Sequence, residues 1–365
     1  MDDLARELEV AHPELSTVRE AAREPVYLVG GAVRDLLLGR PRADVDLVVE
    51  GDAAALAERL GGASAEHERF GTVKVDVEGH EVDVASARSE AYPEPGALPV
   101  VAPAESVEQD LARRDFSVNA IAVSLQGEPC LIDSYGGKAD LDDGLLRVLH
   151  DRSLVDDPTR AIRAARYASR FGFALEPKTE ELLRRADLTT VSADRRRAEL
   201  ERLAAEESAR EGFRLLAEWG LIDLRPDGLQ LMKAVGELLE TPYWAEEVPR
   251  EQALVAAALG PPGGEEVLAS MWKPRPGEGV ELAERRDPVE LILARAMGAD
   301  WLDSYLTAWR KIQLEIDGDD LISAGIEQGP AIGRGLRAAR HKKLEGEIAG
   351  RDEELATALA AALRD

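Results

Sequence analysis

The sequence predicts an α+β protein in which a small mixed β-sheet head precedes an all-helical neck, body and tail. Short apolar or alternating runs separated by turn residues occupy residues 26–132, a pattern typical of strands. From Gly137 onwards apolar residues recur with helical period, and glycine and proline divide the chain into successive helices. Because 365 residues can form more than one core, we expect a head over 1–140, a neck over 141–215, and a body and tail over 216–365.

Within the head, helices and strands are expected to alternate. Residues 1–24 have the pattern of a helix, and Thr72–Val84 alternates around Glu78-Gly79, which predicts a β-hairpin. Residues 93–103 are rich in proline and are expected to form a loop. The remaining strands are expected at 26–29, 45–49, 118–125 and 131–132, and the remaining helices at 33–38 and 52–60.

The composition excludes several classes of protein. Cys130 is the single cysteine, so neither an internal disulfide nor a cysteine-rich zinc site can form. Neither a signal-peptide pattern nor a long apolar run is visible. We therefore expect a cytoplasmic protein without a membrane span.

The charge is acidic overall but uneven along the chain. A formal net charge of −26 at first argues against a nucleic-acid partner, because phosphate-binding surfaces are usually basic. Residues 110–215, however, carry 18 Lys and Arg against 20 Asp and Glu. These arginines either form a docking track for a polyanion or pair with acids on solvated helix faces. The acidic flanks fit either repulsion of nucleic acid away from the centre or adaptation to high salt.

A glycine pair and two nearby aspartates give the first indication of chemistry. Gly30-Gly31 follows the apolar run Tyr27–Val29, and Asp44 and Asp46 come shortly after it. Because strand residues alternate, both aspartates emerge on one face while their neighbours point to the core. Two such carboxylates can hold two magnesium ions, which activate an attacking hydroxyl and stabilise a departing pyrophosphate. The pattern predicts phosphoryl chemistry on a nucleotide.

Asp83 is the expected third carboxylate. It alternates with Val82 and Val84 on the second arm of the hairpin and can face the same side as the first two. An isolated Asp-x-Asp is commonly a solvated strand edge, but the glycine pair and Asp83 make a catalytic site the better interpretation. We expect Asp44, Asp46 and Asp83 to be catalytic, with Asp44 and Asp46 as ligands of two Mg²⁺.

Five motifs in order resemble those of class II tRNA nucleotidyltransferases, the family of CCA-adding enzymes and poly(A) polymerases within the DNA polymerase beta superfamily. They begin at Gly30, Asp44, Arg113, Asp156 and Asp194 and read GGAVRD, DVD, RRDFSVNA, DDPTRAIRA and DRRRAEL. A weaker similarity, to the helical tail of some members, covers residues 325–333. The resemblance implies a polymerase-beta-type nucleotidyltransferase head, magnesium dependence, and CTP, ATP and the tRNA 3′ end as partners.

The first and third motifs are implied to bind the sugar and phosphates of the nucleotide. Arg114 and Asn119 would donate hydrogen bonds to phosphate or sugar oxygens, and Asp115 would accept one from a ribose hydroxyl, selecting NTP over dNTP. The alternative is an ion pair that secures the entry to a strand. The residues concerned are Gly30, Gly31, Arg34, Arg114, Asp115 and Asn119.

The fourth motif is implied to select the base. Asp157 and Arg160 are three residues apart on a predicted helix, so their side chains would share a face. A carboxylate acceptor beside a guanidinium donor matches the Watson–Crick edges of cytosine and adenine, whereas uracil and guanine present the reverse order. Without the family, a helix-start carboxylate and a surface salt bridge are the simpler explanation.

Further arginines follow at helical spacing. Arg163 and Arg166 would extend the nucleotide-binding face, with Arg170 beyond them. Arg195 and Glu199, four apart in the fifth motif, are expected to form an ion pair that braces their helix.

The implied function is template-independent addition of C and/or A nucleotides to the 3′ end of tRNA, with release of pyrophosphate. One alternative is a bacterial poly(A) polymerase, but the basic Arg-Arg-Phe segment typical of those enzymes is missing from residues 68–74. Residues 85–99 instead look like the loop of CCA-, CC- and A-adding enzymes. A second alternative is a catalytically silent RNA-binding paralogue, which the intact motifs disfavour. The sequence does not distinguish CCA, CC and A addition.

Overall fold

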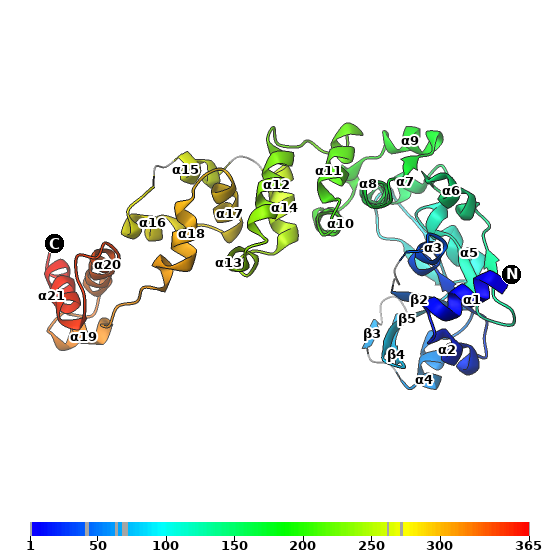
Figure 1. Ribbon diagram of the computed structural model, residues 1–365, viewed down its shortest axis with the longest axis horizontal. Coiled ribbons are helices and arrows are strands. Elements are labelled where there is room, and N and C mark those ends of the chain that lie inside the picture. Colours follow the sequence, from blue (N-terminus) through cyan, green and yellow to red (C-terminus); the bar gives the residue numbers. More distant parts are fainter. Residues whose placement is uncertain are drawn as a thin grey trace. The chain divides into compact units, whose positions relative to one another are not determined.

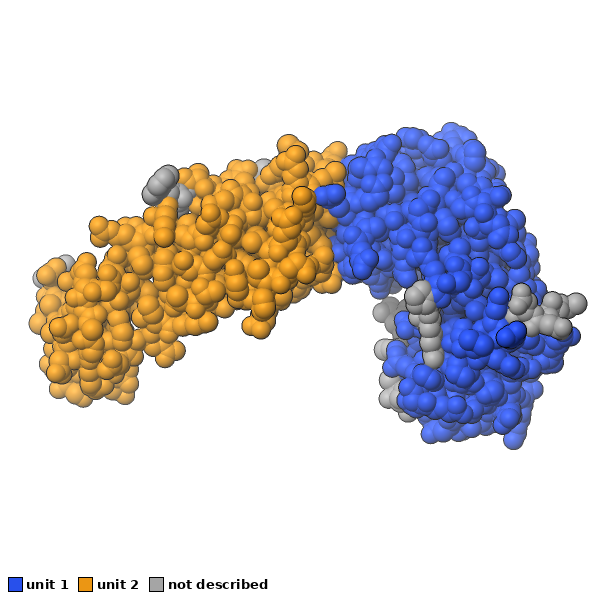
Figure 2. Space-filling model, in the orientation of Figure 1, with its two compact units in different colours: residues 1–222 blue, residues 223–365 orange. Residues whose placement is uncertain are grey.

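The computed structural model describes residues 2–40, 44–62, 65–67, 72–260, 263–270 and 273–364. The chain forms two compact units, residues 1–222 and 223–365 (Figure 2). The first unit contains every motif residue from Gly30 to Glu199. A finer division of this unit into head and neck remains a prediction.

The first unit is built around a seven-stranded mixed sheet with the order β3-β4-β5-β2-β1-β8-β9. Strands β2, β3, β4 and β5 of this sheet are labelled in Figure 1. Neighbouring strands pair antiparallel, except that β2 and β5 are parallel and place Asp46 opposite Asp83. The strands are β1 (Val26–Val29), β2 (Val45–Val49), β3 (Ala65–His67), β4 (Thr72–Val77), β5 (His80–Ser86), β8 (Ala122–Ser124) and β9 (Cys130–Ile132).

Short helices surround this sheet, and their ends follow from local sequence. Helix α4 begins after Asp52, whose carboxylate accepts a hydrogen bond from the Ala54 N–H and so caps the helix. Its buried face, Leu56 and Ala57, packs against β4 and β5. The helices are α1 (Asp2–Ala11), α2 (Leu15–Ala21), α3 (Gly31–Leu37), α4 (Ala53–Arg59), α5 (Val107–Ala112) and the 3₁₀ turn η1 (Ser117–Asn119).

Two further strands, β6 (Arg88–Ala91) and β7 (Val100–Pro103), form a separate antiparallel ribbon after β5. Val100 is exposed, so this ribbon is held by its backbone pairing rather than by burial of that residue. Its tip is tied down at Gly96, whose N–H donates to the carbonyl oxygens of Val155 and Asp156.

Helices complete the first unit, with α8 at their centre. Helix α8 buries Ile162 and Ala165, packs against α10 and α11, and ends at Gly172, which has a φ of 73°. These elements are α6 (Gly137–Asp143), β10 (Leu145–Leu146), α7 (Ser153–Asp156), α8 (Thr159–Phe171), β11 (Ala174–Leu175), α9 (Pro177–Leu183), η2 (Leu188–Thr190), α10 (Ala193–Ala204) and α11 (Ala209–Glu218).

The second unit is helical throughout its described residues. Trp244 is fully buried, and its Nε1 donates to Asp303 at 2.9 Å. No helix in the described ranges has both the length and the apolar character needed to cross a membrane. The elements are α12 (Gly228–Leu238), α13 (Pro242–Ala245), α14 (Arg250–Leu259), α15 (Gly264–Ser270), α16 (Pro276–Ala283), α17 (Pro288–Ala296), α18 (Trp301–Thr307), η3 (Trp309–Lys311), α19 (Gly318–Ser323), α20 (Pro330–Leu344) and α21 (Arg351–Ala362).

The predicted α+β class is confirmed, and the local predictions that failed have identifiable causes. Residues 1–24 contain two helices, because Pro13 lies in a turn between them. Residues 118–125 enter the sheet through a 3₁₀ turn before β8, and the expected loop at 93–103 ends in strand β7. Residues 68–71, on which the poly(A) polymerase comparison partly rests, lie outside the described residues.

Candidate active site

The glycine pair lies where β1 ends and α3 begins. Gly30 has a φ of 65°, a conformation that disfavours residues with a side chain. A Cβ at this position would lie 2.5 Å from Nη1 of Arg114. The positive φ of the turn therefore favours glycine here, and the Arg114 guanidinium lies in the space that a Cβ would take.

The predicted carboxylates gather at one edge of the β2–β5 pair. Asp46 and Asp83 are partners in the parallel register and so share a face, while Asp44 is exposed immediately before β2. Desolvation raises the pKa of Asp46 to about 6. Arg114 lowers that pKa, and the neighbouring charges of Asp83 and Asp44 raise it. Repulsion from these two carboxylates adds to the desolvation of Asp46, and a bound cation would relieve it.

This donor set fits magnesium in part. Carboxylate oxygens are the ligands that Mg²⁺ prefers, and the ion commonly takes one or two from the protein and the rest from water and substrate phosphates. Among the described residues, no three His, Cys, Asp or Glu side chains are grouped closely enough to hold a metal by themselves. Asp83 lies 3.6 Å from Nζ of Lys74. Asp44 and Asp46 are thus the residues that would hold the metal together with substrate.

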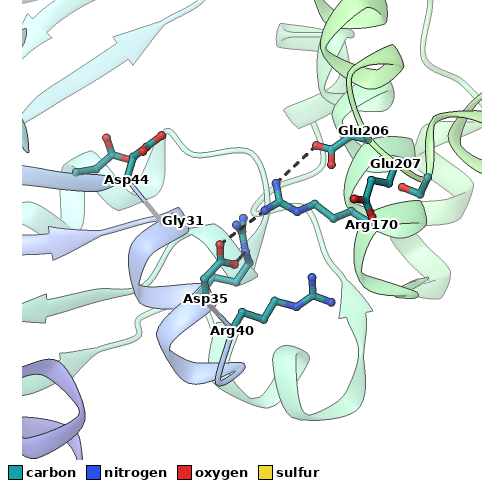
Figure 3. Close-up of a pocket in the computed structure, with 10 residues that line it drawn as sticks. Gly31, Asp35, Arg40, Asp44, Arg170, Glu206 and Glu207 are labelled. Carbon is teal, nitrogen blue, oxygen red and sulfur yellow. Dashed lines mark hydrogen bonds and ion pairs between the residues drawn. The ribbon is translucent and has the colours of Figure 1, made fainter. Parts of the chain in front are cut away.

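A cavity of about 830 Å³ opens beside Asp44 and Asp46 (Figure 3). Arg170 reaches across it, with Nη2 4.0 Å from Oδ2 of Asp35 and Nη1 3.6 Å from Oε1 of Glu206. The cavity is lined by Gly31, Arg34, Asp35, Arg40, Asp44, Asp46, Arg170, Glu206, Glu207 and Ser208.

Three arginines of this cavity surround one aromatic ring. The guanidinium carbons of Arg34, Arg40 and Arg170 lie 4.6, 4.6 and 5.2 Å from the centre of the Phe171 ring. Within the described ranges, the guanidinium of Arg40 makes no hydrogen bond or ion pair, so its donors are available to an anion such as a polyphosphate.

A second cavity, of about 570 Å³, shares Gly31, Arg34, Asp46 and Arg170 with the first. It brings together most of the predicted nucleotide-binding residues with residues of the β6–β7 ribbon. Its lining is Gly30, Gly31, Arg34, Asp46, Glu90, Tyr92, Leu98, Pro99, Arg113, Arg114, Asp115, Asn119, Asp157, Arg160, Arg163, Arg166, Tyr167, Arg170 and Arg195.

Arg34, Asp115 and Asn119 are linked by hydrogen bonds. Arg34 Nη1 donates to Oδ1 of Asn119 at 2.7 Å, and Nδ2 of Asn119 donates to Oδ1 of Asp115 at 2.9 Å. Burial would raise the pKa of Asp115, but Arg163 and Asn119 outweigh it and hold the pKa below its usual value. Asp115 is therefore an ionised acceptor within the second cavity.

Asp157 lies just before α8 and not within it, which corrects the prediction of a shared helix. Its backbone is extended ahead of Pro158, and its Oδ1 accepts hydrogen bonds from the N–H and the hydroxyl of Thr159. Arg160, on the first turn of α8, donates to the hydroxyl of Ser153 and to the carbonyl oxygen of Arg113. Both residues are buried, so the simple surface salt bridge is excluded.

Arg163 and Arg166 differ in their surroundings. Arg163 is within ion-pair distance of three carboxylates, whereas the guanidinium of Arg166 forms no hydrogen bond or ion pair with any described residue. The guanidinium of Arg166 lies 5.2 Å from the centre of the Tyr167 ring. Arg166 thus keeps its donors free at the cavity wall.

The comparisons with known proteins agree with this geometry. Residues 26–147 match the family model "Poly A polymerase head domain", and residues 172–225 match "Probable RNA and SrmB- binding site of polymerase A". A CC-adding tRNA nucleotidyltransferase from Deinococcus radiodurans is 36% identical over 90% of this chain and 87% of its own. This chain belongs to the class II tRNA nucleotidyltransferase family.

Other similar proteins are named for the addition of different nucleotides. An A-adding tRNA nucleotidyltransferase from Geobacter sulfurreducens is 34% identical over 95% of this chain but 46% of its own length, so the chain spans less than half of that relative. The solved Thermotoga maritima CCA-adding enzyme complexed with tRNA has a TM-score of 0.70 at 29% identity and covers 98% of both chains.

In the present chain, the contacts of Arg195 correct the expected Arg195–Glu199 pair. Arg195 donates instead to Oδ1 of Asp157 at 3.0 Å and to the carbonyl oxygen of Gly96 at 2.6 Å. Glu199 pairs with Arg163 and Arg202. The expected brace is wrong because a buried carboxylate and a free carbonyl compete better for the guanidinium than an i,i+4 neighbour does.

Sequence reasoning also missed Tyr92 and Gly96. The Tyr92 ring lies 5.9 Å from the Arg160 guanidinium, and its hydroxyl donates to Glu90. Gly96 has a φ of 71° and would place a Cβ 2.7 Å from the Thr190 carbonyl oxygen. The Pro-Gly-Ala-Leu-Pro run around Gly96 marks a turn in the sequence, but nothing local indicates what the turn contacts.

Proposed function

We propose that this protein adds C and/or A nucleotides to the 3′ end of tRNA from CTP and ATP, releasing pyrophosphate. The observation that supports this most directly is the second cavity, whose lining includes Asp46, Asp115, Asp157 and Arg160. A site for metal, a ribose acceptor and a base-reading pair within one cavity is what a template-independent nucleotidyltransferase needs. Such a reaction belongs in the cytoplasm, where we place it.

The proposed reaction is an in-line displacement. The terminal 3′-hydroxyl oxygen of the tRNA attacks the α-phosphorus of the nucleotide, and the bond to the β-phosphate oxygen breaks. Two Mg²⁺ held by Asp44 and Asp46 would supply Lewis acidity at the reacting oxygens. Asp83, opposite Asp46 in the strand register, would accept the hydroxyl proton. The remaining catalysis is positioning.

The polyphosphate is proposed to extend into the first cavity. Arg40 and Arg170 line its wall near Asp44, and both lie over the Phe171 ring. Along α8, Arg160 and Arg170 are ten residues apart, which corresponds to about 15 Å of helix. That length is comparable to a nucleoside triphosphate, so one helix can serve the base at one end and the phosphates at the other.

Base choice is proposed to rest on Asp157 and Arg160. Three of the four hydrogen bonds that the Asp157 carboxylate accepts from described residues are to Oδ1, which leaves Oδ2 capacity for an exocyclic amino group. The Nε–H of Arg160 is without a hydrogen-bond partner among the described residues. An acceptor beside a donor suits cytosine and adenine and leaves uracil and guanine with unpaired groups.

The decisive experiment offers three tRNA acceptors, ending at the discriminator base, at the first C, or at CC. Each is incubated with labelled CTP or ATP and magnesium. We expect incorporation on at least one acceptor, and the pattern identifies CC, A or full CCA addition. Asp46→Asn removes one metal ligand and should reduce incorporation by more than about 100-fold. Absence of incorporation by the unaltered protein on all three would refute the proposal and favour a silent RNA-binding paralogue.

A poly(A) polymerase is the second candidate, because residues 26–147 match a head domain that bears that description. It predicts repeated ATP addition to an unstructured RNA 3′ end. An oligo(A) primer is therefore added as a fourth acceptor. Long products on that primer, with none on tRNA, would replace the main proposal.

A further inference from the structure

We propose that Arg163 positions Asp115 and Asp157 together, so that ribose choice and base choice are coupled through one guanidinium. The inference rests on the proposed function, in which these two carboxylates read the sugar and the base. It gives Arg163 a role in selectivity without contact to the nucleotide.

Each nitrogen of the Arg163 guanidinium lies near a different carboxylate. Its Nε lies 3.1 Å from Oδ2 of Asp115, its Nη2 lies 3.1 Å from Oδ2 of Asp157, and its Nη1 lies 3.5 Å from Oε1 of Glu199. Because the group is planar and rigid, fixing one edge fixes the directions of the other two.

Both nucleotide-facing carboxylates have Arg163 beside their Oδ2. Nη2 donates a hydrogen bond to Oδ2 of Asp157, whereas Nε is at ion-pair distance from Oδ2 of Asp115 without forming a hydrogen bond. Oδ1 of Asp115 is held by Phe116 and Asn119, and Oδ1 of Asp157 is held by Thr159 and Arg195. In the described part of the chain, Oδ2 of each has Arg163 as its single hydrogen-bonding or ion-pairing group. The neighbouring contacts therefore hold Oδ1 of each carboxylate and Arg163 holds Oδ2. The orientation of each carboxylate depends on both.

The surroundings make these contacts strong. The side chains of Arg163, Asp115 and Asp157 are 20%, 13% and 8% exposed, so water screens the pairs weakly. Apart from the cost of burial, Arg163 is the first cause that lowers the pKa of Asp115 and of Asp157. The Glu199 carboxylate, itself bound to Arg202 at 2.6 Å, closes the third edge and keeps the guanidinium from turning.

A shared guanidinium has a consequence that separate contacts would not have. Oδ2 of Asp115 and Oδ2 of Asp157 are the oxygens proposed to contact the nucleotide. If Arg163 moves, both of these oxygens lose their partner. Discrimination against deoxyribose and discrimination against uracil should then weaken together, although the two recognition groups belong to different motifs. Asp115 and Asp157 are 42 positions apart in the sequence, and no local pattern would suggest the link.

The test measures binding of CTP, dCTP and UTP to the full chain by isothermal titration calorimetry, in the presence of Mg²⁺ and without tRNA. For Arg163→Gln we expect both Kd ratios, dCTP to CTP and UTP to CTP, to fall about tenfold or more, since each loses a charge-assisted contact. A general loss of structure would weaken all three nucleotides equally and leave both ratios unchanged.

Arg195→Gln is the matched control, because Arg195 contacts Asp157 but not Asp115. It should lower the uracil ratio and leave the deoxyribose ratio as it is. Arg163→Lys keeps the charge without the fork, so one ammonium cannot hold both oxygens; we expect near-normal thermal stability with both ratios reduced. This variant keeps the test open where Arg163→Gln does not fold.

The outcomes separate the two proposals. If the unaltered protein shows no preference for CTP over dCTP and UTP, the proposed function fails and the coupling fails with it. If the unaltered protein has both preferences but the Arg163 variants lose one alone, or neither, the coupling is overturned while the function stands. Loss of both in the Arg163 variants, with loss of one in Arg195→Gln, supports it.

Discussion

Asp46 is a proposed metal ligand whose ionisation opposes folding. Its folded-state pKa of about 6 lies above the roughly 3.9 of an unfolded aspartate, so the folded protein binds the proton more tightly. Stability from this group is present below the unfolded pKa and is lost as the pH rises through 6. In the absence of metal, the ionised side chain therefore destabilises the protein at neutral pH.

Asp46→Asn should consequently stabilise the metal-free protein while reducing the proposed nucleotide incorporation. In a chelating buffer we expect a gain at pH 8 of no more than about 1 kcal/mol, because the side chain is partly solvated, and no gain near pH 4. Denaturant melts at several pH values measure it. Asp143→Asn should show no such dependence, because Asp143 is an exposed residue of α6 whose carboxylate makes no hydrogen bond or ion pair with the described residues. A loss of stability at pH 8 would contradict the assignment.

Residues whose role follows from the local chain could be predicted from the sequence. Gly30 was identified by its place after an apolar run, and Asp46 and Asp83 by alternation within strands. The contact between Arg195 and Gly96 could not be predicted, because the two residues are 99 positions apart. A hydrogen bond to a backbone carbonyl oxygen leaves no pattern in either segment. Arg34 and Asn119 were expected at the nucleotide but are also bonded to each other, a contact between distant motifs.

At the scale of elements, alternation and turn chemistry were sufficient for the strands that bury one face. The hairpin at 72–84 is confirmed, with Glu78 and Gly79 at φ values of 56° and 83° in the turn between β4 and β5. Strand β7 escaped prediction because its exposed residues carry no hydrophobic alternation and its partner, β6, supplies the pairing. Pairing of an exposed ribbon is a tertiary property that composition does not encode.

Helical glycines offer a test of packing between elements. Gly335 of α20 faces α21 so closely that a Cβ would lie 2.6 Å from the carbonyl oxygen of Ala358, whereas a Cβ on Gly236 of α12 would meet nothing within 4 Å. Gly335→Ala should therefore destabilise the second unit by about 1–3 kcal/mol through overpacking. Gly236→Ala should stabilise it by about 0.5–1 kcal/mol, since alanine favours helix.

The two alanine variants serve as controls for each other, because the chemical change is the same and both sites lie inside helices. Urea unfolding followed by far-UV circular dichroism gives the two free energies. Equal effects of the same sign would mean that helix propensity outweighs the α20–α21 contact, and the close approach at Gly335 would lose its structural meaning.

At the scale of the whole molecule, excess negative charge acts on folding as well as on binding. The chain carries 71 acids against 45 Lys and Arg, and its ion pairs include exposed pairs within one helix, such as Arg184–Glu180 and Arg214–Glu218. Exposed pairs of this kind contribute about 0–1 kcal/mol each and lose it in salt. The uncompensated charge of −26 opposes compaction over longer distances, and salt relieves that repulsion.

The two effects have opposite signs, and the unpaired excess should decide the result. The Debye length falls from about 30 Å at 0.01 M to about 3 Å at 1 M ionic strength, which removes repulsion between distant acids but leaves buried pairs such as Arg163–Asp115 nearly intact. We therefore expect the melting temperature to rise by several degrees over this range of KCl at pH 7.5. The rise should shrink near pH 5, close to the isoelectric point of about 4.7, where little net charge remains to be screened. A melting temperature that falls with salt at pH 7.5 would mean that the exposed ion pairs outweigh the repulsion.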